Sequence, residues 1–182
     1  MSGGILLPLR RLMRLGRDSQ GAVAVEFAFI APILILMYFA IAEFTDGMIA
    51  KRRVSHVAST IADLTSRVSQ VNTADTSDIF AVGRTVITPL PTTSLRMRLS
   101  SVTANSGGTS HIDWSDANNW TPYAVGATVT PPAAVISANQ SIVMAEVQYT
   151  YNSPVRYLLP NGILLTQTYY LRPRISNMVV HN

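Results

Sequence analysis

Residues 21–44, GAVAVEFAFIAPILILMYFAIAEF, decide the fold of this 182-residue chain. The run from Phe27 to Ala42 carries no charge. It extends back to Ala22, and so reaches membrane length, if Glu26 is accepted inside the helix. A helix of about 20 residues rises about 30 Å, which matches the hydrocarbon core of a bilayer. The stretch therefore predicts a membrane-spanning helix over 22–44, with one acidic residue near its beginning.

Basic residues flank this segment on both sides. Four arginines precede it against Asp18, and Lys51, Arg52 and Arg53 follow it. The pI of about 9.8 therefore comes largely from the flanks, a pattern typical of membrane proteins and not of a nucleic-acid surface. We expect residues 1–21 to be a basic cytoplasmic leader, the lipid bilayer to be a partner, and nucleic acid not to be one.

Three interpretations of the apolar segment compete. The first is an uncleaved signal anchor that holds a periplasmic binding module. The second is a secretory signal peptide that releases a soluble domain after Ala42, because Ala40-Ile41-Ala42 fits an A-x-A cleavage site. The third is a prepilin-type leader that is cut after Gly21 on the cytoplasmic side. Hydropathy alone leaves all three open.

Glu26 favours the third interpretation. An acidic residue costs roughly 2.5–3.5 kcal/mol at the centre of a membrane helix, and the first two interpretations give it no use. Cleavage after Gly21 creates a free amine on Ala22, and Glu26 becomes the fifth residue of the new chain. We therefore expect processing at Gly21 and Ala22, and an assembly role for Glu26.

A family resemblance lies in the same residues. The sequence GAVAVEFA at 21–28, followed by IAP at 30–32, resembles the N-terminal signature of TadE/TadG-like proteins. These are pseudopilins, or minor pilins, of the Tad (Flp-type) pilus, and the resemblance extends over about residues 17–50. It implies a structural function in pilus assembly and processing by the prepilin peptidase of the bacterial inner membrane.

The resemblance also implies roles and a location. Gly21 is the last residue of the leader, and Glu26 neutralises a subunit amine during assembly. Phe27 stands where the major pilins of this system typically carry tyrosine, which argues for a minor subunit. The implied partners are the peptidase and other pilins or pilus assembly proteins. The implied location is the inner membrane, in a single pass with a periplasmic C-terminal domain, or an extracellular pilus.

Pro32 lies inside the apolar helix. It has no N–H to donate to the carbonyl of Ala28, and its ring crowds that turn. Two interpretations stay open: a kink of the kind that membrane helices tolerate, or a softened helix that melts locally when it packs in a filament. On the second interpretation Pro32 joins Glu26 and Phe27 as a residue of assembly.

An apolar stripe predicts that the helix continues beyond the membrane to about residue 71. Its spacing of 3, 4, 3, 4 and 3 is that of one helix face. We expect residues 45–71 to be an amphipathic continuation that packs on the chain's own sheet. The stripe consists of Val54, Val57, Ile61, Leu64, Val68 and Val71.

Residues 72–182 predict an extracytoplasmic α+β domain. A second helix is expected at about 78–88, capped by Asp75, Ser77 or Asp78. From Ser94 the period changes to two, with Leu95, Met97 and Leu99 on one face and Arg96, Arg98 and Ser100 on the other. Further strands are expected at 142–151 and 166–171, with a short one at 127–130 inside an exposed loop, 124–141.

The fold class is therefore α+β and pilin-like, with a long N-terminal helix packed on a small antiparallel sheet. Trp114 and Trp120 are expected to pack against this sheet and not to bind a ligand. The sequence has no cysteine, and it contains no HExxH, GxSxG or P-loop motif. We expect a non-enzymatic protein with no cofactor, no metal and no small-molecule substrate.

Overall fold

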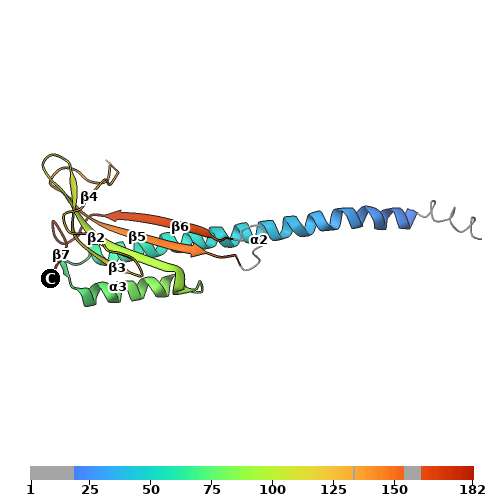
Figure 1. Cartoon of the computed structure of the whole chain (residues 1–182), viewed down its shortest axis with the longest axis horizontal. Helices are drawn as coiled ribbons and strands as arrows, with labels where there is room; N and C mark the ends of the chain where they lie inside the picture. Colours follow the sequence, from blue (N-terminus) through green and yellow to red (C-terminus); the bar gives the residue numbers. More distant parts are fainter. Residues whose placement is uncertain (1–18, 133, 154–160) are drawn as a thin grey trace, which may run out of the picture. The chain divides into compact units, whose positions relative to one another are not determined.

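The computed structural model describes residues 19–132, 134–153 and 161–182 (Figure 1). The chain divides into two compact units, Met1–Phe44 and Thr45–Asn182. The predicted leader lies outside the described residues as far as position 18.

Helix α2 (Ser19–Ser66) contains 48 residues and runs through Pro32. The long N-terminal helix is thus confirmed, but it ends at Ser66 and not near 71. The hydroxyls of Thr65 and Ser66 donate to the carbonyls of Ile61 and Asp63, at 2.8 Å each. Such local bonds compete with helix continuation.

The end of the predicted stripe therefore leaves the helix. Val68 lies in the turn that follows α2, and its side chain is 38% exposed. Val71 belongs to strand β1 (Gln70–Val71), which pairs in parallel with β7 (Val180–His181). The sequence did not predict this pair, because two-residue strands carry no periodicity.

The second unit contains a five-stranded antiparallel sheet in the order β4-β3-β2-β5-β6. The predicted strands are present, although β6 begins at Ile163 and not at 166. The 3₁₀ turn η1 (Thr92–Ser94) leads into the first strand of this sheet. The strands are β2 (Leu95–Ala104), β3 (Ser110–Asn118), β4 (Thr128–Val129), β5 (Ser141–Tyr151) and β6 (Ile163–Leu171).

The second half of α2 and helix α3 (Thr73–Val86) pack on one face of the sheet (Figure 1). Val54, Val57 and Ile61 of the apolar stripe are buried here, which confirms that this part of the stripe packs on the chain's own sheet. The largest fully buried side chains of this core are Val54, Val57, Ile61, Val71, Ile87, Leu95, Met97, Leu99 and Val143.

Helix α3 begins at Thr73, five positions before the predicted start at 78. The amide groups of Ala74 and Asp75 donate to the Asn72 side chain at 2.8 and 3.0 Å. The backbone of Asn72 in turn donates to the Asp75 carboxylate at 3.0 Å. This is a capping box, so Asn72 is the N-cap, and the prediction of Asp75, Ser77 or Asp78 was wrong.

Arg98 lies on the opposite face of the sheet, where it is buried and not solvated as the alternation suggested. Its Nε donates to the Glu146 carboxylate at 2.8 Å, and its Nη1 donates to the Thr121 carbonyl at 3.1 Å. The guanidinium lies 3.5 Å from the ring centre of Tyr123 and 4.2 Å from that of Trp120. Cation–π contacts and a paired charge therefore fasten the loop after β3 to the sheet.

The predicted loop 124–141 is only partly exposed. Ala127, Val135 and Ile136 are half-buried against a second apolar cluster on this face of the sheet. The two tryptophans pack against the chain, as expected: Trp114 belongs to the first core, and its Nε1 donates to the Val179 carbonyl at 2.7 Å. The second cluster contains Val102, Ile112, Ile142 and Met144.

Candidate functional site

The first unit exposes an apolar helical surface. Phe27, Phe29 and Ile33 are 66, 75 and 65% exposed, although side chains of this kind are favourably removed from water. By length and composition, the helix that includes this segment is long and apolar enough to cross a membrane. Such a surface is compatible with lipid or with the helices of other proteins.

The predicted processing and assembly residues lie along this surface. Gly21 and Ala22 are in the first turn of the described helix, and a Cβ built on Gly21 meets nothing within 4 Å. Glu26 is exposed, four residues after Ala22. Because positions i and i+4 share a helix face, the structure places Ala22 and Glu26 on the same side of α2.

Phe27 is adjacent to Glu26, whereas Pro32 lies further along the helix. Six residues separate Glu26 from Pro32, which corresponds to a rise of about 9 Å. The helix is continuous through Pro32, but continuity does not distinguish a tolerated kink from a segment that melts during assembly. The structure thus places Ala22 and Glu26 on one face of α2, with Phe27 on a different face and Pro32 further along the helix.

Glu43, at the other end of the apolar segment, is buried, and only 2% of it is exposed. Hydropathy located residue 43 at the edge of the segment, and it carried no information about which atoms cover the side chain.

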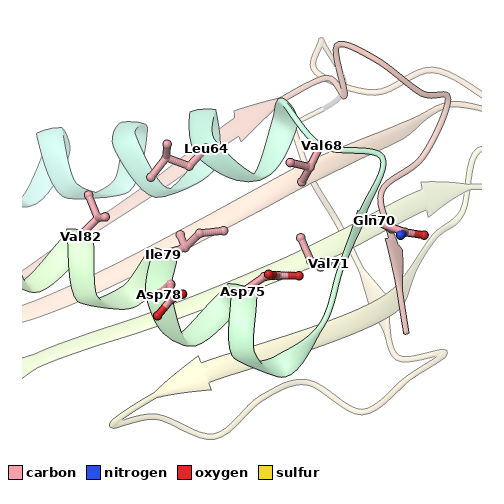
Figure 2. A pocket seen from close by; sticks show the side chains of 8 residues that line it. All are labelled: Leu64, Val68, Gln70, Val71, Asp75, Asp78, Ile79 and Val82. Carbon is pink, nitrogen blue, oxygen red and sulfur yellow. The ribbon is translucent and has the colours of Figure 1, made fainter.

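A groove lies between α2 and α3 in the second unit (Figure 2). Leu64 from α2 and Ile79 and Val82 from α3 point into it, and Val68 closes one end. Its volume is about 360 Å³, and two carboxylates, Asp75 and Asp78, line it on the α3 side. The lining thus combines apolar side chains with negative charge.

The groove was not predicted, because it depends on how closely α3 approaches α2. Gly83 sets that approach: a Cβ at this position would lie 2.6 Å from the Met97 sulfur and 3.3 Å from Cγ2 of Ile61. Both distances are below ordinary van der Waals contact. The signal in the sequence for this close packing was a glycine in the middle of α3.

An ion-pair network joins the end of α2 to the C-terminal segment. The Asp63 carboxylate lies 2.5 Å from Arg67 and 2.6 Å from Arg174. The hydrogen bond from Arg67 and the positive charge of Arg174 hold the pKa of Asp63 below its usual value. The backbone of Arg174 also donates to the Ser66 carbonyl at 2.8 Å, so this segment closes over the helix end.

A second polar cluster resembles a catalytic arrangement but lacks its geometry. The Thr76 hydroxyl donates to Oδ2 of Asp116 at 2.6 Å, and Nε2 of His181 lies 3.0 Å from the same oxygen. A nucleophile must bond to its base, whereas here both groups bond to one carboxylate oxygen. The cluster instead joins α3, β3 and β7. Within the described ranges, no group of three or more metal-ligating side chains is present.

These features define a class of protein: a membrane-length apolar helix that continues into a helix-on-sheet domain. Residues 21–63 match the family model of the TadE-like proteins, and the match covers the exposed apolar helix and most of its packed continuation. The resemblance inferred from residues 21–32 is thereby confirmed for the helix, and it points to a role in Tad pilus assembly. Comparisons with curated proteins and with solved structures give no match.

Proposed function

We propose that this chain is a pseudopilin, or minor pilin, that takes part in the assembly of a Tad-type pilus. The role is structural and non-enzymatic. The observation that carries the proposal is the coincidence of the TadE-like match over 21–63 with a helix whose apolar side chains are exposed over 23–41.

The proposed sequence of events begins in the inner membrane. The chain inserts with its leader in the cytoplasm and its C-terminal domain in the periplasm. Prepilin peptidase then cuts after Gly21. Glycine is unfavourable inside a helix by about 1 kcal/mol relative to alanine, so the helix is locally weak at the proposed cut.

The bilayer then holds the mature helix until other pilin helices replace the lipid. Apolar side chains such as Phe29 and Ile33 suit both environments, because each removes them from water. Lipid and a bundle of pilin helices differ in the polar contacts that they offer. A buried charge therefore decides whether replacing lipid by helices is favourable.

Glu26 supplies that charge. After the cut, the new amine on Ala22 lies one helical turn away, a rise of about 6 Å. An amine of the same chain or of a neighbour pairs with the Glu26 carboxylate and offsets a desolvation cost of several kcal/mol. A carboxylate near a helix N-terminus is also favoured by the helix dipole.

Replacement of Glu26 tests this function in piliated cells. We expect Glu26→Ala to enter the membrane normally, because it removes a charge from an apolar helix. We expect it to reduce surface pili strongly, counted by electron microscopy and by sheared-pilus yield. Glu26→Asp is the matched control that keeps the charge. Normal piliation by the alanine variant would exclude the proposed role of Glu26.

A further inference from the structure

The groove between α2 and α3 has the chemistry of a docking site (Figure 2). Val68 and Val82 remain 38 and 40% exposed, which favours an apolar occupant. Asp78 is an exposed carboxylate on the groove's α3 side, and its side chain forms no ion pair or hydrogen bond with the described part of the chain. An occupant that brings a cation beside an apolar group would match both features.

The same chain carries a surface with this chemistry on the second half of α2. Met48, Lys51, Arg52 and His56 are exposed, and Met48 is 43% accessible. Their spacing of three, one and four residues places them on one helix face. In the described part of the chain, no ion pair joins these basic groups to an acid. We call these four residues the basic face.

We propose that the groove of one copy of this chain receives the basic face of a second copy. Met48 packs on the apolar floor, since its flexible thioether adapts to irregular gaps. Arg52 lies against Asp78 and sets the register. Complementary charge favours this pairing over groove-to-groove or face-to-face contact, which would bring like charges together.

Groove and basic face are different surfaces of the chain, so the contact is head-to-tail. From Met48 to Leu64 the helix rises about 24 Å. When the two α2 helices run in the same direction, the contact shifts one copy along the helix by roughly that rise. The contact therefore forms as a copy moves out of the bilayer into an assembly, and not between two copies at the same depth in one membrane. An assembly of any length therefore keeps one groove free at one end and one basic face free at the other. Such heterologous contacts extend as open helical assemblies when the rotation does not close.

This inference deepens the proposed function and rests on it, because it names a contact through which subunits of the assembly would join. Its test uses full-length chains expressed in piliated cells, with cross-links analysed in the sheared pili and in the cell envelope. The natural chain has no cysteine, so introduced thiols report on single positions. We expect mild oxidation to cross-link Met48→Cys on one chain to Val82→Cys on another.

Two controls make the cross-link specific. Val125 is 76% exposed in the loop after β3, and we expect Val125→Cys to give no product with Met48→Cys. Equal yields from Val82→Cys and Val125→Cys would overturn the proposal. A product between Val82→Cys and a different pilin, with none between copies of this chain, would also overturn it.

Charge reversal separates docking from folding. We expect Asp78→Arg alone and Arg52→Asp alone each to lower the cross-link yield by about tenfold or more, because like charges meet at the contact. When both cross-linking chains carry both changes, the carboxylate of Arg52→Asp on one copy meets the guanidinium of Asp78→Arg on the other, and the yield should recover. Arg96→Asp, at an exposed position on β2, should leave it unchanged. A double variant that stays as low as the single variants would overturn the proposal.

The outcomes for the two proposals are distinguishable. Loss of pili in Glu26→Ala together with an unchanged cross-link in Asp78→Arg would reject the groove contact and keep the pilus function. A mature chain that is not cut after Gly21 would reject the processing step, whatever the cross-link shows.

Discussion

The two halves of α2 form one continuous helix and meet opposite conditions. Over residues 23–41 the large apolar side chains are exposed, whereas Val54, Val57 and Ile61 in the second half are completely buried. Both halves have helical hydrogen bonds, so secondary structure does not distinguish them. The difference lies in the distribution of apolar residues: all round in the first half, and along one stripe in the second.

This contrast indicates what each half requires. The stripe of the second half is satisfied by the chain's own sheet, so that half folds with the domain. The first half exposes its apolar side chains, a surface that fits lipid or the helices of other proteins. The following experiments test this division, from the largest expected effect to the smallest.

Truncation of Ile61 should have the largest effect. Replacement of a fully buried isoleucine by alanine costs about 2–5 kcal/mol, and Ile61 is 0% exposed. We expect Ile61→Ala to lower the free energy of unfolding of the domain by that amount, measured by urea titration in detergent micelles. Trp114 and Trp120 report on the domain by fluorescence. Ile33→Ala is the control, and an equal loss there would contradict the division.

Gly83 and Gly47 offer a matched pair of helical glycines. Alanine gains about 1 kcal/mol of helix propensity over glycine, and at Gly47 the nearest atom to a Cβ is 3.9 Å away. At Gly83 the Met97 sulfur would be 2.6 Å away, and overpacking typically costs about 1–3 kcal/mol. We expect Gly47→Ala to raise the urea midpoint and Gly83→Ala to lower it. Equal shifts would mean that α3 does not approach Met97 of β2 as closely as described.

Removal of the α3 cap should have a smaller effect. Asn72→Ala loses the side-chain acceptor for two backbone amides, and such changes typically cost about 1 kcal/mol. We expect the domain to unfold at lower urea while insertion of the first half into membranes is unchanged. Asn72→Asp retains an acceptor and should stay near the natural stability. Impaired insertion in Asn72→Ala would show that the halves are coupled.

The Asp63 network should give the smallest effect, because it is exposed. The pKa of Asp63 is lowered from its usual 3.8, first by the hydrogen bond from Arg67. Its contribution is therefore present above the unfolded pKa and is lost as the pH falls through the lower folded value. We expect Asp63→Asn to lower the urea midpoint slightly at pH 7, with the difference shrinking below about pH 4. A difference that grows on acidification would contradict this sign.

The regular parts of the fold were predictable from periodicity. The apolar segment, the stripe through Ile61 and the alternation of β5 each repeat one pattern over several turns or residue pairs. The burial of the stripe and of β5 follows directly from that pattern.

The remaining features depend on contacts between distant residues. Arg98 alternates as a solvent-facing residue, and only the loop with Trp120 and Tyr123 covers it. The sequence placed the start of the second helix at about 78, although Asn72 and Asp75 together start it at Thr73. The spacing of residues within one segment does not reveal which distant loop covers Arg98 or which side chain caps α3. The groove beside Gly83 could not be predicted for the same reason.

The N-terminus of the mature protein tests the central claim most directly. Edman degradation or intact-mass analysis of the chain purified from its own membrane would identify it. A chain that begins at Ala22 is the result expected for a pseudopilin cut after Gly21. A chain that begins at Met1, as for an uncleaved anchor, or at Glu43, as for a secreted domain released after Ala42, would contradict the account.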